Sequence, residues 1–277
     1  MSQDAERVRI LLDPESGIDA GVARDWAARL ELPLCGPDEA GGDELLLAAG
    51  SDGLELRRGA GRRNGYARVD LARRALASRS GRAGSGEILR RAVGRKASFV
   101  VDATAGFGDD AIALAGLGHR VLAFERSPIV AALLEDGRRR ALQDSRLGEI
   151  AGRLEVRRGD SLELLETLDE TPDAVYIDPM YPESAHTPSA LPPLKIQLLK
   201  RLAGADTDAA SLLERALGIG ARRVVVKRPL RTPALPGPRS TSHAGKLVRY
   251  DVYQALGNSA SKSRKGIPKT GSDAYDE

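Results

Sequence analysis

From residue 98 onward, short apolar runs alternate with amphipathic stretches. The pattern predicts strands at 98–102, 119–125, 153–157, 173–178 and 222–227, the first of them buried, with a last strand pair around 247–253. The intervening stretches predict helices at 109–117, 128–140, 160–166 and 209–217. Strands and helices that alternate at this length form parallel βαβ units. We therefore expect an α/β, Rossmann-like fold, with a mostly parallel sheet and helices on both of its faces.

The N-terminal part has a different pattern, which predicts a strand at 8–12, a helix at 21–30 and a hairpin of 44–49 with 54–58 across a Gly-Ser-Asp-Gly turn. Gly, Arg and Ser then dominate, so we expect a mobile loop at 79–87 and a helix at 87–93. The predicted organisation is a small α+β region (1–78), a basic linker and entry helix (79–97), the main α/β domain (98–256) and a disordered tail (257–277).

Composition narrows the class of protein. Of 277 residues, 42% are hydrophobic, which excludes wholesale disorder. The single cysteine, Cys35, excludes a disulfide scaffold, and the three histidines lack metal-ligand spacing, so we expect no metal site. The chain has no apolar signal core and no apolar run long enough to span a membrane. We expect a cytoplasmic protein.

The formal net charge of +3 hides two basic segments. Residues 57–96 contain thirteen Lys or Arg against two acids, and residues 222–249 contain eight against none. Clustered cations bind polyanions because they displace the counterions of phosphates, although such segments can also be simple solvated surface. The candidate RNA contacts in the two segments are Arg79, Arg82, Lys227 and Arg228.

A glycine-rich turn follows the first strand of the main domain. The strand ends at Asp102, the turn contains Gly106 and Gly108, and the next helix begins near Asp109. Glycine allows a tight turn and lets the backbone approach a ligand closely. By itself this pattern also fits a dinucleotide-binding fold.

Acidic residues follow the next two strands as well. Glu125 ends the second strand, where a carboxylate can accept both hydroxyls of a ribose. Asp160 follows the third strand and can bind an adenine amine, while the adjacent Ser161 is either a second contact or a helix N-cap. Asp102, Glu125 and Asp160 follow three successive strands, which places them on one rim of the sheet, where open α/β sheets bind ligands. With Asp109 and Asp110 also at this rim, a pyrophosphate is disfavoured and a cationic adenosine compound is favoured. The pattern thus favours S-adenosylmethionine (SAM) over NAD.

The fourth strand ends in Asp178-Pro179-Met180-Tyr181-Pro182. This run resembles the Asp/Asn-Pro-Pro-aromatic signature of methyltransferases that act on exocyclic amines of nucleic-acid bases. Such an amine is a poor nucleophile because its lone pair is delocalised into the ring. Hydrogen bonds to the Asp178 carboxylate and the Pro179 carbonyl would localise the lone pair, and Tyr181 would stack on the base. These three are the candidate catalytic residues.

Five stretches in order resemble the ribosomal RNA small subunit methyltransferase J family: 102–111, 124–137, 175–182, 223–229 and 246–253. The resemblance implies a Rossmann-like SAM-dependent methyltransferase domain that methylates the N2 amine of a guanine in 16S rRNA, as naked RNA or in the 30S particle. The resemblance also implies that the cofactor is contacted by Asp109, Asp110, Glu125, Arg126, Asp160, Ser161 and Asp178. The candidate cofactor residues from the glycine turn are Asp102, Gly106 and Gly108.

The chain departs from this family in two places. Asp109-Asp110 stands where the family usually has Arg-Asp, and the run after the Asp-Pro turn contains only Lys195 where the family is lysine-rich. Both changes remove positive charge from the mouth of the site. The alternatives to a guanine-N2 enzyme are an adenine-N6 methyltransferase, an NAD-dependent oxidoreductase and a non-catalytic rRNA-binding assembly factor.

Overall fold

The computed structural model describes residues 8–13, 17–50, 52–61, 65–79, 84–180, 194–203 and 208–254. The predicted disordered tail at 257–277 lies outside these residues, as do Arg82 and Tyr181.

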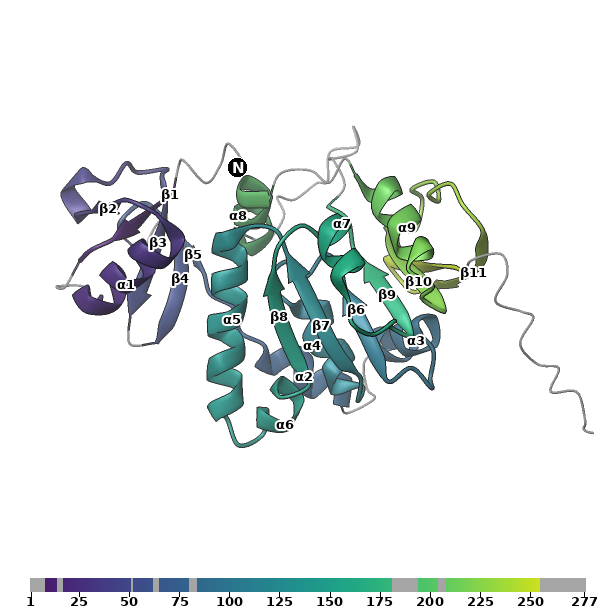
Figure 1. Ribbon diagram of the computed structural model, residues 1–277. Coiled ribbons are helices and arrows are strands. Elements are labelled where there is room, and N and C mark those ends of the chain that lie inside the picture. Colours follow the sequence, from purple (N-terminus) through teal and green to yellow (C-terminus); the bar gives the residue numbers. More distant parts are fainter. Residues whose placement is uncertain are drawn as a thin grey trace, which may run out of the picture.

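The N-terminal region forms a five-stranded sheet in the order β2-β1-β3-β4-β5 (Figure 1). Its strands are β1 (Val8–Leu11), β2 (Leu34–Cys35), β3 (Leu45–Gly50), β4 (Gly53–Arg58) and β5 (Tyr66–Ala67). The predicted hairpin is confirmed, because β3 and β4 pair antiparallel. Helix α1 (Ala20–Leu30) begins where the Asp19 carboxylate accepts a hydrogen bond from the Val22 N–H. A short 3₁₀ turn, η3 (Pro37–Glu39), precedes β3.

The main domain contains a seven-stranded sheet in the order β11-β12-β10-β9-β6-β7-β8. Its strands are β6 (Phe99–Asp102), β7 (Arg120–Glu125), β8 (Leu154–Arg158), β9 (Ala174–Ile177), β10 (Arg223–Pro229), β11 (Arg239–Ala244) and β12 (Val248–Tyr253). Strands β6 to β10 are parallel, and β12 is antiparallel to both β10 and β11. The predicted Rossmann-like α/β class is confirmed.

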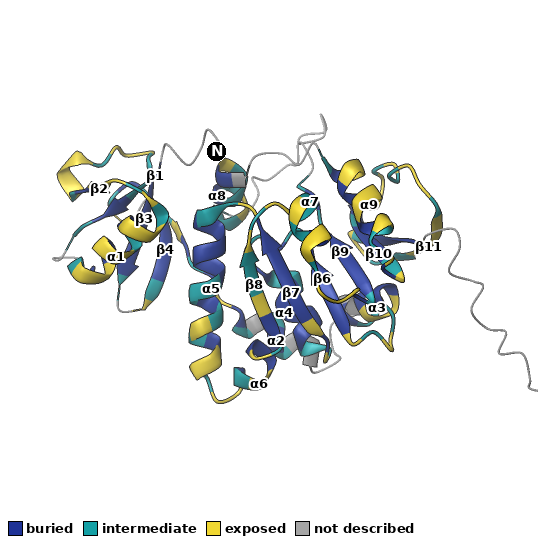
Figure 2. Ribbon diagram, in the orientation of Figure 1, coloured by how far each residue is buried: buried dark blue, intermediate teal, exposed yellow. Residues whose placement is uncertain are grey.

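Helices cover both faces of this sheet (Figure 1). Those predicted are α4 (Asp109–Gly116), α5 (Pro128–Gln143), α7 (Ser161–Leu164), which continues into η5 (Leu165–Thr167), and α9 (Ala209–Gly218). Neighbouring residues of β6 point to opposite faces, so Val100 joins the core under α4 and α5 while Val101 joins the core under α9. Figure 2 shows the buried strands between these layers.

Three helices were not predicted: α2 (Ala72–Arg79), α6 (Gly148–Ala151) and α8 (Leu194–Ala203). The predicted entry helix is present as α3 (Gly84–Val93). The expected loop at 79–87 is wrong at both ends, because α2 reaches Arg79 and α3 begins at Gly84. Arg79 prolongs an Arg- and Ala-rich helix, and both residue types favour helix. The first turn of α3 is Gly-Ser-Gly, which is helical against its propensity because Leu89 and Val93 further along α3 are buried in the core. Strand β11 was missed because its Arg-Ser-Thr-Ser-His-Ala sequence is polar and almost wholly exposed.

Helix α5 lies between the two sheets and joins them (Figure 1). Its Asp136 carboxylate accepts a hydrogen bond from the Leu54 N–H of β4 at 3.1 Å. Helix α8 also contacts the N-terminal region, where Arg201 donates to the Asp43 carbonyl at 3.0 Å. Within the described residues, no helix is long and apolar enough to span a membrane.

Candidate active site

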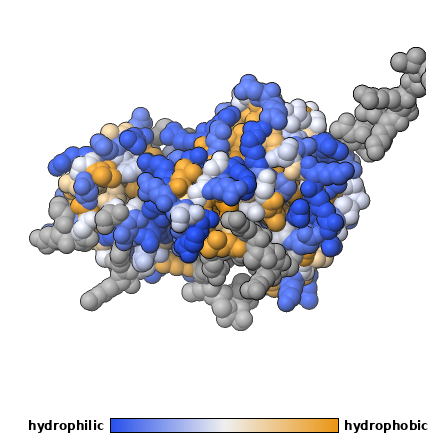
Figure 3. Space-filling view, turned by 90° about the horizontal axis from the view of Figure 1, so that it is seen from below, coloured by the Kyte–Doolittle hydropathy of each residue, from blue (hydrophilic) through white to orange (hydrophobic). Residues whose placement is uncertain are grey.

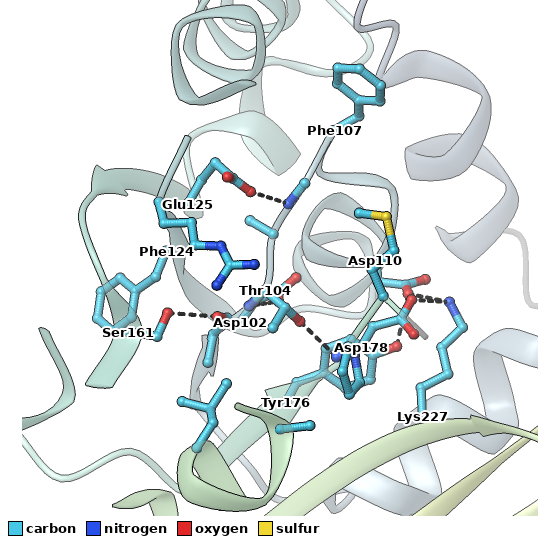
Figure 4. A pocket seen from close by; sticks show the side chains of 18 of the residues that line it. Asp102, Thr104, Phe107, Asp110, Phe124, Glu125, Ser161, Tyr176, Asp178 and Lys227 are labelled. Atoms are coloured by element: carbon cyan, nitrogen blue, oxygen red, sulfur yellow. Dashed lines mark hydrogen bonds and ion pairs between the residues drawn. The ribbon is translucent and has the colours of Figure 1, made fainter. Parts of the chain in front are cut away.

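A cavity of about 400 Å³ opens at the carboxyl ends of the parallel strands. From β6 the chain proceeds outward through β7 and β8, then returns to β9 on the other side of β6. Ligands of open α/β sheets bind in the crevice that such a reversal creates. The cavity is lined by residues from the ends of β6, β7 and β9 and by side chains from α2, α8, α9 and β10 (Figure 4).

The glycine turn forms one wall of the cavity. Gly106 and Gly108 adopt φ angles of 54° and 77°, in the left-handed region that favours glycine. The Gly108 N–H donates to the Ala105 carbonyl at 2.8 Å, which closes the turn just before Asp109 begins α4. Gly106 lines the cavity, whereas Gly108 packs behind it against Leu134 of α5.

Glu125 ties this turn to the end of β7. One carboxylate oxygen accepts the Gly106 N–H at 2.9 Å (Figure 4). The other accepts the Ser127 N–H at 2.8 Å. A carboxylate oxygen can accept more than one hydrogen bond, so both oxygens can also receive a ribose hydroxyl. The carboxylate thus fixes the turn and offers acceptors to a ligand.

Asp160 and Ser161 lie at the start of α7 and both line the cavity. Asp160 is the N-cap, since its Oδ1 accepts the Leu162 N–H at 2.8 Å. The alternative in which Ser161 is the cap is wrong, because its hydroxyl donates to the Ala103 carbonyl at 2.6 Å. This bond joins α7 to the segment after β6.

Opposite this wall, Lys227 of β10 bridges two carboxylates (Figure 4). Its Nζ lies 2.8 Å from Asp178 Oδ2 and 2.6 Å from Asp110 Oδ2. The Tyr176 hydroxyl also donates to Asp110 Oδ2, at 2.8 Å. The Thr104 hydroxyl accepts the Asp178 N–H at 2.6 Å, which fixes the backbone at the start of the Asp-Pro turn.

Burial sets the ionisation of these carboxyls. Desolvation raises the pKa of Asp178 to about 6; Lys227 opposes this rise and Asp110 adds to it. Although 35% of the Asp178 side chain is exposed, it borders the cavity, where protein excludes much of the solvent. Burial also raises the pKa of Asp102 to about 8, so its carboxyl is mostly protonated at neutral pH.

The two other members of this group are held in their charged forms. Burial alone would raise the pKa of Asp110, but Lys227, the Tyr176 hydroxyl and Arg74 together hold it below its ordinary value. Burial would lower the pKa of Lys227, but Asp178 and Asp110 raise it well above the ordinary lysine value. The group therefore combines one ammonium with two carboxylates once Asp178 is ionised.

Most of the predicted cofactor residues meet at this cavity. Those lining it are Asp102, Gly106, Asp109, Asp110, Glu125, Arg126, Asp160, Ser161 and Asp178, together with Pro179 of the candidate catalytic turn. Of the candidate RNA contacts, the Arg79 side chain and all of Arg82 lie outside the described residues. Lys227 lies inside the cavity, and Arg228 is only 5% exposed, so neither is placed as a surface phosphate contact.

Sequence reasoning missed several residues that line or brace the site. Thr104 and Tyr176 carry hydrogen bonds to the Asp-Pro turn and to Asp110, and Arg74 of α2 approaches Asp110 at 3.5 Å. At the mouth, Lys195 of α8 pairs with Asp109 at 3.0 Å and lies over the Phe107 ring. Thr104 and Tyr176 stand in motifs that pointed to the site, and the run that contains Lys195 was expected at its mouth, but nothing in the local pattern of α2 pointed there.

The cavity suits a cationic adenosine compound. Among the described residues that line it, seven are acidic and three are basic. An excess of carboxylates attracts a positively charged sulfonium and repels a pyrophosphate. Glu125 and Asp160 stand at adjacent strand ends with acceptor oxygens for a ribose and an adenine amine. The residues present therefore fit SAM.

Comparisons with known proteins agree. The chain matches the SAM_MT family model, a putative SAM-dependent methyltransferase family, over residues 26–255. The crystal structure of the SAM-dependent methyltransferase NGO1261 from Neisseria gonorrhoeae superposes with a TM-score of 0.69 and 32% identity, covering 90% of this chain and 96% of that one. Fold and site thus define a SAM-dependent methyltransferase, and SAM rather than NAD is its cofactor.

Relatives of known name narrow the class. Ribosomal RNA small subunit methyltransferase J from Pseudomonas aeruginosa is 41% identical over 262 residues, covering 92% of this chain and 98% of the relative. The Pseudomonas fluorescens protein of the same name is 41% identical over 238 residues, covering 83% and 89%. The chain belongs to the ribosomal RNA small subunit methyltransferase J family.

Proposed function

We propose that this enzyme, acting in the cytoplasm, transfers a methyl group from SAM to the exocyclic N2 amine of a guanine in small-subunit rRNA. The observation that carries the choice of an amine is Asp178, which follows β9 beside the cavity with its backbone held by Thr104. The names of the relatives support small-subunit rRNA as the substrate.

The acidic walls hold the cofactor. Glu125 accepts the ribose hydroxyls, Asp160 accepts the adenine amine, and the carboxylates beside them favour the cationic sulfonium. Gly106 lets the backbone of the turn approach the ligand closely. When bound, SAM supplies an electrophilic methyl group.

Asp178 and Pro179 orient the amine. Because Lys227 binds Asp178 Oδ2, the proposal assigns Oδ1 as the acceptor for one N–H, and the Pro179 carbonyl accepts the other. These bonds localise the nitrogen lone pair and aim it at the methyl carbon. Tyr181, outside the described residues, stacks on the base in this proposal.

The proton balance is simple. The nitrogen forms its bond to the methyl carbon as the carbon–sulfur bond breaks, and the sulfur keeps that electron pair. The nitrogen then carries a positive charge and becomes acidic, so its proton passes to Asp178 Oδ1 and on to water. No base is needed before the methyl group moves.

Methylation of 30S particles from a strain that lacks the protein tests the proposal. The particles and deproteinised 16S rRNA are incubated with enzyme and SAM, and the nucleosides are mapped by mass spectrometry. We expect one new N2-methylguanosine, absent when Asp178→Ala enzyme is used. Methylation at adenine N6 would overturn the guanine assignment. Binding of particles without any methylated nucleoside would favour an assembly factor.

The substrate surface is part of the proposal. Arg79 and Arg82 come from the first basic segment and remain the proposed rRNA contacts. The position of Lys227 inside the cavity and the burial of Arg228 argue against the same role for these two residues.

A further inference from the structure

Lys227 occupies an unusual place for a lysine. Only 19% of its side chain is exposed, and its ammonium group contacts the carboxylates of Asp110 and Asp178. The sheet register produces this arrangement, because Val226 pairs with Ile177 and the residues that follow, Lys227 and Asp178, lie side by side. Helix α4 brings Asp110 to the same ammonium from its first turn.

We propose that Lys227 is a positioning residue for methyl transfer, which keeps the Asp178 carboxylate ionised and oriented so that Oδ1 can receive the substrate amine. This role rests on the proposed function of Asp178. It deepens that function because it names the group on which the acceptor depends. It also replaces a contact with an RNA phosphate, which an ammonium held by two carboxylates is poorly placed to make.

The charges around Asp178 explain why it needs a cation. Asp110 of α4 is the neighbouring carboxylate that opposes its ionisation, whereas burial keeps Asp102 of β6 mostly protonated. The Tyr176 and Tyr250 rings pack beside these groups. Arg74 of α2 lies 3.5 Å from Asp110 Oδ1, whereas Lys227 contacts Asp110 Oδ2. Among the described residues, Lys227 is the cation whose contact with Asp178 the structure shows directly.

Removing this ammonium should favour protonation of Asp178. Two neighbouring carboxylates without a cation cannot both remain ionised easily, so the pKa of Asp178 should rise further from about 6. A protonated Asp178 donates where it should accept, and it no longer localises the lone pair of the amine. Conversely, removing the charge of Asp110 should ease ionisation of Asp178.

The experiment compares single-turnover methyl transfer into 30S particles between about pH 5 and 9.5. This range includes the expected acid limb, which is the part of the pH profile where the rate falls as the pH is lowered. The variants are Lys227→Met, Lys227→Arg and Asp110→Asn, with Arg24→Gln on α1 as a control that removes a positive charge outside the cavity. SAM affinity is measured by calorimetry for each. The methylated nucleoside is identified in every reaction.

In the wild type, we expect the rate to fall as the pH drops through about 6. Lys227→Met should move this acid limb to higher pH. At a fixed pH on the limb, the rate should then fall about tenfold for every pH unit by which the limb moves. Asp110→Asn should move the limb to lower pH. Lys227→Arg should restore part of the wild-type profile, and Arg24→Gln should match the wild type.

Acid limbs that stay fixed in both Lys227→Met and Asp110→Asn would overturn the proposal. Weaker binding of 30S particles by Lys227→Met with an unchanged acid limb would also overturn the proposal. It would favour the alternative in which Lys227 contacts an RNA phosphate. If Lys227→Met does not fold, Asp110→Asn alone tests the proposal. Movement of its acid limb to lower pH would support the proposal, and any other result would overturn it. A nucleoside other than N2-methylguanosine, combined with the expected movements of the limb, would refute the guanine assignment and leave the role of Lys227 standing.

Discussion

Substitution of Gly108 by alanine tests how tightly the glycine turn is packed. At φ 77° a Cβ is strained, which costs about 1–2 kcal/mol. The new Cβ would also lie 2.3 Å from Leu134 Cδ1. Leu134 of α5 is fully buried in the hydrophobic core, so its side chain has little room to move away from the new Cβ. Overpacking of this kind costs about 1–3 kcal/mol more. We therefore expect Gly108→Ala to lower the free energy of unfolding by about 2–5 kcal/mol.

Urea denaturation followed by circular dichroism measures this loss, and Gly220→Ala is the matched control. Gly220 has a similar φ of 81°, but no atom lies within 4 Å of the place that a Cβ would take, so only the backbone cost of about 1–2 kcal/mol applies. The double variant Gly108→Ala/Leu134→Ala loses core packing but removes the clash, so it should be less destabilised than the sum of its single variants. Equal losses in Gly108→Ala and Gly220→Ala would refute the packing explanation.

Three further expectations concern the site. Asp178→Ala should lower methyl transfer at least about 100-fold, because the amine loses its orienting acceptor. Thermal unfolding near the wild-type temperature would show that the variant is folded, and full activity would remove Asp178 from the mechanism. Glu125→Ala should weaken SAM binding at least about tenfold in calorimetry, since hydrogen bonds to a charged acceptor contribute about 1.5–3 kcal/mol each; unchanged affinity would rule out the ribose contact. Neutralising Arg68, Arg90 and Arg91 together should weaken rRNA binding and flatten its salt dependence in filter binding, and no change in either would make them solvated surface.

The central strands could be predicted because each is buried on both faces and reads as a continuous apolar run. Ala174–Ile177 is an example, with all four of its residues buried. β11 could not be predicted in this way, since a polar edge strand depends on the hydrogen bonds it makes to β12 rather than on its own pattern. α8 follows a proline-containing run, and its packing against the N-terminal region is a tertiary contact that no local signal records.

The site was predictable as far as topology determines it. Parallel strands place their carboxyl ends on one edge, so Asp102, Glu125 and Asp160 were expected on one rim of the sheet, and they line one cavity. Topology alone could not predict which side chains pair within the cavity. The bridge from Lys227 to Asp110 depends on the register of β10 and on the angle at which α4 leaves the glycine turn. The sequence therefore suggested a cation for RNA where the fold uses a cation inside the cavity.

Side-chain pairing also limits how many residues of the two basic segments are available to bind rRNA. Arg57 is buried against Glu55, and Arg249 binds Asp251 and three backbone carbonyls, so these cations serve the fold. Arg90 and Arg91 are exposed, but they end α3 just before β6 and so lie toward the amino edge of the sheet, opposite the cavity. Figure 3, the view from below, shows a largely hydrophilic face with small apolar patches. In the proposed complex, long-range attraction comes from the exposed arginines, while the target nucleotide is selected at the acidic cavity. The number of basic residues in the two segments therefore overstates the surface that is available to RNA.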